Sequence, residues 1–143
     1  LNEIRKEIDK RKARKKKIIV QGKSIEFNRK ILQNKKVDVL ILEHKNKKDF
    51  LKQRDSGLNH VLCKLAKENN ITLAINLKEL LEAKGKEKAL ILARMIQNIK
   101  LIKKFKNKLI IINRSGRKSQ EIATLLRVMG ADTKLAKETA TSQ

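Results

Sequence analysis

Four short runs of aliphatic residues constrain the fold of this chain more than any other feature. They read KIIVQ, VDVLILE, ITLAINL and KLIIIN, and lie at 17–21, 37–43, 71–77 and 108–113. Runs of this length and composition are typical of strands buried on both faces of a parallel sheet. Segments with helical spacing lie between and after them, at 25–33, 58–68, 90–105 and 119–129. The alternation predicts an α/β fold with four parallel strands.

Two architectures contain parallel strands that alternate with helices: an open doubly wound sheet and a closed (βα)-barrel. The alternation alone does not choose between them. A further helical segment at 1–14 precedes the first strand, which is an odd beginning for a complete domain. We therefore interpret 1–143 as a single domain that forms the later part of a longer chain.

Helix-capping residues agree with this division. Ser24 is placed to cap the helix that carries Ile25, and Gly130 is placed to end the last helix. Gly85 is expected to separate a short turn at 80–81 from the long helix that follows.

The chain is strongly basic, with 37 Lys and Arg against 15 Asp and Glu and a formal net charge of +22. This surplus predicts a polyanionic partner, first of all a nucleic acid, whose phosphates bind Lys and Arg. A membrane surface fits less well, because the chain has no Trp, no Tyr and three Phe to serve as anchors. The shortage of aromatic rings and the excess of Lys favour contacts with phosphates over base stacking.

The chain has one cysteine, Cys63, so an intrachain disulfide is impossible and a reducing compartment is favoured. No apolar run approaches the roughly 18 residues that cross a bilayer, and no secretory signal is visible. We therefore expect a soluble, cytoplasmic protein. The richness in Lys and Ile favours an archaeal source.

Basic residues follow the predicted strands at their carboxyl ends, where ligands of both candidate architectures bind. The loop after the second strand carries Lys45, Lys47 and Lys48, and the loop after the fourth carries Arg114, Arg117 and Lys118. We predict that these side chains contact RNA phosphates. The basic run RKARKKK at 11–17 is expected to contact RNA without sequence specificity or to remain solvated.

Two short motifs resemble catalytic or nucleotide sites without meeting their requirements. The run GRKS that begins at Gly116 resembles the end of a nucleotide-binding phosphate loop, but the earlier glycine of that motif is missing. The run RDSGLNHV, which begins at Arg54, contains the three side-chain types of a hydrolase triad. A triad needs its base between nucleophile and acid, usually on separate loops, so three such residues at one helix start do not suit it.

We expect a helix start instead at RDSGLNHV, with Asp55 or Ser56 as N-cap and His60 on the exposed face. Its free backbone N–H groups, with Gly57 and Arg54 beside them, would bind an RNA phosphate. The competing interpretation is a capped structural helix that binds nothing. Arg54, Ser56, Gly57 and His60 are therefore candidate RNA-binding residues.

Metal chemistry has little support in the sequence. The two histidines, His44 and His60, form no His-x-His pair, and the single cysteine excludes a Cys-x-x-Cys pair. We predict no catalytic residue and no metal site in this chain. A metal-dependent phosphoesterase that uses Glu43, His44 and Ser56 remains the main alternative, and a general RNA-binding protein of ribosomes or chromatin is a weaker one.

Several segments, taken in order, resemble one protein family. They are RDSGLNHVLCKLAKEN, ITLAINLKELLEAKGKEKALILARMIQNIKLIKKF, KLIIINRSG and SQEIATLLRVMGAD. They are similar to the ribonuclease P protein component 3 family of archaeal and eukaryotic ribonuclease P, and the resemblance extends over about 17–137. RDSGLNHVL is its most specific part.

The resemblance implies a TIM-like (βα)-barrel, similar to the polymerase-and-histidinol-phosphatase hydrolases but without their metal ligands. The family has further strands before KIIVQG, so this chain would be an N-terminally incomplete copy. It would be a noncatalytic, RNA-binding subunit of ribonuclease P, the endoribonuclease that removes the 5′ leader from precursor tRNA. Its partners would be ribonuclease P RNA, which carries Mg²⁺, protein component 2 and the other protein subunits, with no cofactor on this chain and only indirect contact with precursor tRNA.

Overall fold

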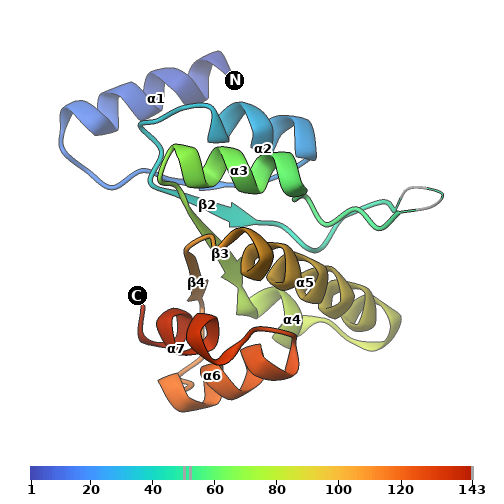
Figure 1. Cartoon of the computed structure of the whole chain (residues 1–143). Helices are drawn as coiled ribbons and strands as arrows, with labels where there is room; N and C mark the ends of the chain where they lie inside the picture. The colour runs from blue at the N-terminus through green and yellow to red at the C-terminus, as the bar shows by residue number, and fades with distance from the viewer. Residues whose placement is uncertain (50, 52, 143) are drawn as a thin grey trace.

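The computed structural model describes residues 1–49, 51 and 53–142, and it shows the predicted alternation of strands and helices (Figure 1). The elements in chain order are α1 (Asn2–Ala13), β1 (Ile19–Gln21), α2 (Ile25–Leu32), β2 (Val39–Leu42), α3 (His60–Glu68), β3 (Thr72–Asn76), α4 (Leu77–Glu82), α5 (Gly85–Phe105), β4 (Leu109–Ile112), α6 (Ser119–Val128) and α7 (Thr133–Thr141). The α/β class and the four strands are confirmed.

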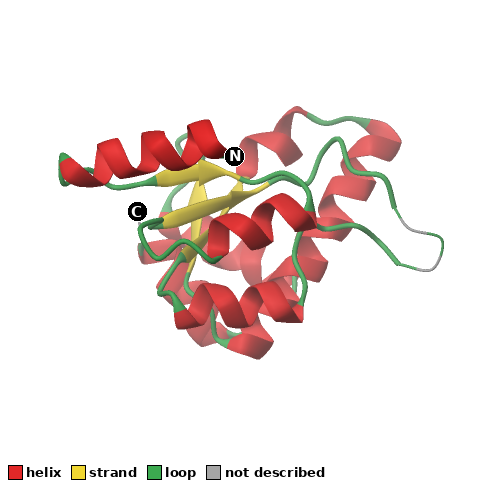
Figure 2. Cartoon of the chain, turned by 90° about the horizontal axis from the view of Figure 1, so that it is seen from above, coloured by secondary structure: helices red, strands yellow, loops and turns green. Residues whose placement is uncertain are grey.

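The four strands form one parallel sheet in the order β1-β2-β3-β4. Every strand thus pairs with its predecessor in the chain, and the order never reverses. A doubly wound sheet requires such a reversal, so the strand order favours the barrel type of connection. Because parallel crossovers are right-handed, helices of consecutive units lie on the same face of the sheet, and α2, α3 and α5 pack side by side (Figures 1 and 2).

Alternate strand residues form the core beneath these helices. Leu40, Leu42 and Leu73 are fully buried, and α5 contributes a matching apolar stripe of Ile91, Met95, Ile99 and Ile102. The opposite face of the sheet is less covered, because Ile19 is 52% exposed and Ile41, Ile110 and Ile112 are only half-buried.

Two of the predicted helix caps are confirmed. Ser24 Oγ accepts a hydrogen bond from Phe27 N at 3.2 Å, at the start of α2. At the end of α6, Gly130 N donates to Arg127 O and Ala131 N donates to Leu126 O, the pair of bonds that defines a Schellman motif.

Three expectations about the helices were wrong. Gly85 does not separate elements but is the first residue of α5, which starts before the predicted Leu90. The expected turn at 80–81 lies inside α4, which is capped by the Asn76 side chain. Helix α7 was not predicted, because its apolar stripe is narrow and consists mainly of alanine. Along the described part of the chain, no helix is long and apolar enough to cross a membrane.

Candidate nucleic-acid interface

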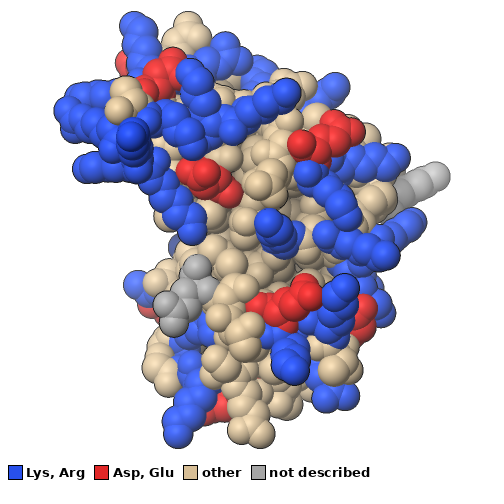
Figure 3. Space-filling model, turned by 60° about the vertical axis from the view of Figure 1, so that its left-hand side comes forward, with Lys and Arg blue, Asp and Glu red and all other residues tan. Residues whose placement is uncertain are grey.

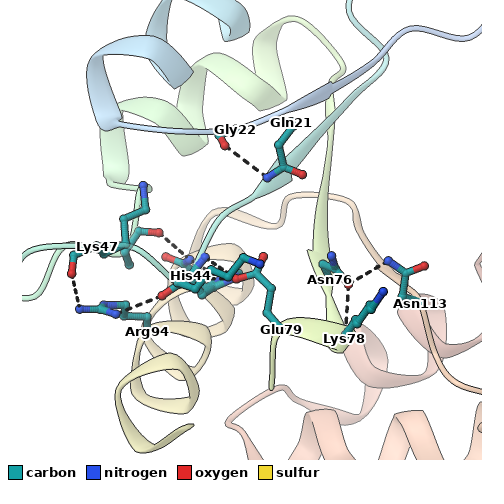
Figure 4. Close-up of polar contacts among 12 residues, drawn as sticks. Gln21, Gly22, His44, Lys47, Asn76, Lys78, Glu79, Arg94 and Asn113 are labelled. Carbon is teal, nitrogen blue, oxygen red and sulfur yellow. Dashed lines mark hydrogen bonds and ion pairs between the residues drawn. The ribbon is translucent and has the colours of Figure 1, made fainter. Parts of the chain in front are cut away.

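The carboxyl ends of the four strands carry a row of polar groups, as expected for a parallel sheet (Figure 4). Asn113, after β4, donates from Nδ2 to Oδ1 of Asn76, at the end of β3, at 2.9 Å. The same Asn76 oxygen accepts from Lys78 N at 3.0 Å. Gln21, at the end of β1, is exposed on the same edge. This edge therefore presents hydrogen-bonding groups from β1, β3 and β4.

The loop after β2 is held from the inside by an acid and an arginine. Glu79 Oε2 accepts from His44 N at 2.9 Å and from Lys45 N at 3.0 Å. Arg94 of α5 donates to His44 O at 3.1 Å and to Lys47 O at 3.2 Å. Burial raises the pKa of Glu79, although the two backbone N–H groups oppose this shift. The backbone of the loop is thereby fixed beneath its lysines.

The three lysines of this loop differ in availability. Lys45 and Lys48 are exposed. Lys47 is half-buried, and its ammonium donates to Lys23 O, at the end of the neighbouring β1 unit. Lys45 and Lys48 are thus free to meet an anion, while Lys47 first joins two loops.

The segment RDSG does not start a helix, which corrects the sequence interpretation. Helix α3 begins at His60, and its N-cap is Asn59, whose Oδ1 accepts from Leu62 N at 2.9 Å. Asp55 Oδ1 instead accepts from Gly57 N at 3.0 Å. The Gly57 N–H group is therefore already paired and is not part of an open helix N-terminus. The predicted phosphate site at Gly57 is wrong in this respect.

Ser56 and Gly57 are buried, so neither presents a surface to RNA. Ser56 Oγ donates to Leu58 O at 3.2 Å and accepts from Gln97 Nε2 at 3.1 Å. Gly57 adopts φ +75°, a left-handed conformation that favours glycine. Their predicted roles as RNA ligands are corrected to structural roles within the loop. Arg54 and His60 flank them, and their side chains are exposed as expected.

His44 is fully buried and neutral. Asn98 Nδ2 donates both to Ser56 O and to His44 Nε2, each at 2.9 Å. Since Ser56 O can only accept, the amide orientation is set, and His44 Nε2 must accept as well. The imidazole proton then sits on Nδ1, which lies 4.0 Å from Glu79 Oε2. Burial, followed by the charges of Lys47 and Arg94, lowers the pKa of His44 to about 3.

The hydrolase alternative finds no geometry here. The His44 ring is bonded to Asn98 and the Ser56 hydroxyl to Leu58 O and Gln97, so base and nucleophile are engaged elsewhere. Both side chains are also buried away from a substrate. Within the described residues, no group of three or more His, Cys, Asp or Glu side chains could hold a metal ion.

Arg114 has a different role from the one predicted. Its guanidinium donates to Ile111 O, Ala140 O, Thr139 O and Ser142 O at 2.7–3.1 Å. At least four of its five N–H groups are thus engaged, and they tie the end of α7 to β4. An RNA contact by Arg114 is therefore withdrawn. Arg117 is half-buried beside it, whereas Lys118 is exposed at the N-cap of α6.

The basic run 11–17 covers the last turn of α1 and the segment that leads to β1, and all of its residues are exposed. Arg11 pairs with Glu7 at 2.8 Å, and Lys12 lies 3.7 Å from Asp38. Figure 3 shows Lys and Arg spread over the upper and lower parts of this face, with an uncharged strip between them.

The residues that position the interface were missed by sequence reasoning. They are Asn28, Glu79, Arg94, Gln97 and Asn98. Asn28 is buried, and its Nδ2 donates to Gly57 O at 2.8 Å while its Oδ1 accepts from Lys23 N at 2.8 Å. A usable signal was the spacing of Arg94, Gln97 and Asn98, three polar residues on one side of an otherwise apolar helix.

Comparisons with known proteins agree on one family. The family model described as RNase P subunit p30 matches residues 2–143. Ribonuclease P protein component 3 of Methanococcus vannielii is 33% identical over 110 residues, which are 77% of this chain and 45% of the relative. The protein of that name from Methanothermobacter thermautotrophicus is 27% identical over 145 residues, covering 98% of this chain and 57% of the relative.

A solved structure shares the fold. A chain in the cryo-EM structure of archaeal ribonuclease P with mature tRNA aligns with a TM-score of 0.76 and 25% identity, covering 96% of this chain and 58% of that chain. The present chain therefore spans about half the length of the relatives it matches.

Proposed function

We propose that this chain, which belongs to the RNase P subunit p30 family, is a noncatalytic RNA-binding subunit of ribonuclease P and acts in removal of the 5′ leader from precursor tRNA. The family match over residues 2–143 carries the proposal. The net charge of +22 and the basic carboxyl edge of the sheet support an RNA partner. The buried, neutral His44 supports a role without catalysis by this chain.

We also infer that the four strands are part of a TIM-like (βα)-barrel. The uninterrupted parallel order supports this architecture. The barrel would place the loops after β1 to β4 at one rim, which is where ligands of such barrels bind.

We place the main RNA contact on the exposed cations of the loop after β2, namely Lys45, Lys48 and Arg54. Asp49 Oδ1 accepts from Asp55 N at 3.0 Å, which brings the two halves of this loop together. The network of Glu79, Arg94 and Asn98 holds the backbone rigidly below these side chains. Lys47, His60, Arg117 and Lys118 would extend the contact.

The holoenzyme context is proposed on the same basis. The partners would be ribonuclease P RNA, protein component 2 and the other subunits, in the cytoplasm, with Mg²⁺ bound by the RNA and no cofactor on this chain. The named structure of archaeal ribonuclease P with mature tRNA supports an assembly of this kind.

A triple variant, Lys45→Ala with Lys48→Ala and Arg54→Ala, tests the RNA surface. Affinity for ribonuclease P RNA should fall, and the slope of log K against log salt should flatten by about 0.7–0.9 for each phosphate that the variant no longer neutralises. The control variant Lys84→Ala with Lys86→Ala and Lys88→Ala removes the same charge from another exposed segment. Equal reductions in both variants would show that only the net charge matters and would reject this site.

Holoenzyme reconstitution tests the function itself. Addition of the chain to ribonuclease P RNA and the other subunits should increase cleavage of precursor tRNA at low Mg²⁺, and excess Mg²⁺ should reduce the need for it. A chain that leaves cleavage unchanged at every Mg²⁺ concentration would contradict the proposal.

A further inference from the structure

The outer edge of β1 has the properties of an unfinished sheet. Ile18 O accepts from Val39 N, and Gly22 N donates to Ile41 O, so these residues of the β1 segment face β2. Because backbone groups alternate along a strand, Val20 also faces β2, and Ile19 and Gln21 direct their N–H and C=O groups outward. In the described ranges 1–49, 51 and 53–142, no strand pairs with this edge.

A groove of about 300 Å³ runs along the same edge, beneath α1. Its walls are mainly apolar, with Ile4 and Ile8 from α1, Phe27 from α2, and Ile18, Ile19 and Val20 from the β1 segment. Ile19 and Val20 lie on opposite faces of β1, so the groove wraps around the strand edge. An extended chain seated there would meet apolar side chains on both of its faces, which is the environment of a parallel strand.

The position of α1 gives the direction of such a chain. Helix α1 lies outermost in the row of helices, beside α2, and it precedes β1 directly (Figures 1 and 2). In a right-handed β-α-β unit, the helix covers the gap between two neighbouring parallel strands. Helix α1 already covers the outer side of β1, and the second strand of that unit is the one that the groove would hold.

We propose that the outer edge of β1 and the groove beneath α1 bind a further parallel strand, rich in aliphatic residues, from the part of the family fold that these 143 residues do not span. The matched relatives are about twice as long as this chain, so they contain enough additional residues for further βα units. A second copy of this chain is a poorer occupant, since two molecules of net charge +22 repel each other. The proposal concerns this edge and does not require that the chain binds RNA.

Co-expression with a defined complement tests the proposal. The complement is the segment of the Methanothermobacter thermautotrophicus relative that lies outside the match to this chain. We expect a 1:1 complex by light scattering. In hydrogen exchange, the amides of Ile19 and Gln21 should become protected by about tenfold or more, whereas those of Val20 and Gly22, already bonded to β2, should change little.

Two pairs of variants make the test specific. Gln21→Pro removes an outward N–H group without removing a bond to β2 and should abolish the complex, while Gln21→Ala keeps the N–H group and should bind. Ile4→Lys places a charge in the groove and should weaken binding by at least about tenfold. Its control, Asn2→Lys, adds the same charge at an exposed position of α1 and should not. Circular dichroism confirms that each variant is folded.

Three results would overturn the proposal. A homodimer of this chain with protected Ile19 and Gln21 amides would identify a second copy as the occupant. If the relative's own two segments bind each other and this chain does not bind the complement, its edge has no such function. If the relative's segments also fail to associate, or if a complex forms without protecting the Ile19 and Gln21 amides, the strand is not added at this edge.

Discussion

The loops after β2 and β4 contain similar motifs, Arg-Asp-Ser-Gly at 54–57 and Arg-Ser-Gly at 114–116, but they use them in opposite ways. In the first, the serine is buried and the arginine side chain is exposed. In the second, the serine is exposed and the arginine is bound to four backbone carbonyls. Whether a basic residue at a strand end can meet RNA thus depends on which other groups already accept its hydrogen bonds.

The largest effect is expected from breaking the support of the first loop. Asn98→Ala would leave Ser56 O and His44 Nε2 without their donor in a buried site, which should lower the free energy of unfolding by on the order of 4 kcal/mol. Urea denaturation measures this. Gln97→Ala, one residue away, removes bonds to the rim of the loop only and should cost less than about 1 kcal/mol. Similar destabilisation in both variants would contradict a special role for Asn98.

The second loop is tested through its arginine. Arg114→Ala should lower the free energy of unfolding by about 2–3 kcal/mol, because it releases the end of α7 from β4. Arg117→Ala, which removes a single weak bond to Arg114 O, should cost less than about 0.5 kcal/mol. Arg114→Ala should leave RNA affinity nearly unchanged in the folded protein. A selective decrease in RNA affinity would restore Arg114 to the interface.

The pH dependence of stability reports on the His44 site, where Lys47, Arg94 and Glu79 surround the ring. The folded-state pKa of His44 is lowered to about 3 from its usual 6.5, so below pH 6.5 the unfolded state binds a proton that the folded state does not. Stability is complete above pH 6.5 and should fall by about 1.4 kcal/mol per pH unit as the pH decreases toward 3. His44→Gln should remove this contribution. Urea titrations of both proteins at several pH values should reveal slopes that differ; parallel slopes would disprove the assignment.

The smallest effect concerns the two glycines, which share φ +75°. A Cβ at Gly57 would lie 3.4 Å from Asn28 Nδ2, an ordinary contact, whereas nothing lies within 4 Å of one at Gly116. Both Gly57→Ala and Gly116→Ala should therefore cost about 1 kcal/mol, from backbone strain alone. Thermal unfolding can compare them. A much larger destabilisation at Gly57 would indicate that the buried loop tolerates no adjustment.

The sequence predicted the strands and most helices because their signals are local. Aliphatic runs and helical spacing identified β1 to β4, and side-chain capping identified the start of α2 at Ser24. The start of α3 was misplaced because Asp55, Ser56 and Asn59 are all good N-cap residues, and only the fold decides which one has the required backbone geometry.

The site was predicted less well because its contacts are not local. The position of the basic loops at one edge followed from the parallel order. The partners of Arg114 lie in α7, which has a weak sequence signal, and the partners of His44 and Ser56 lie in α4 and α5. No pattern within RDSGLNHV reveals that Asn98 and Asn28 bind its backbone from other helices.

The strand order β1-β2-β3-β4 has a consequence for how the chain is made. Each of β2, β3 and β4 pairs with a strand that left the ribosome before it, and each pair is separated by a single short connection with its helix or helices. Domains emerge from the ribosome N-terminal part first, so no early strand in this sheet has to wait for a distant one. The sheet can grow in the direction of translation, one strand at a time.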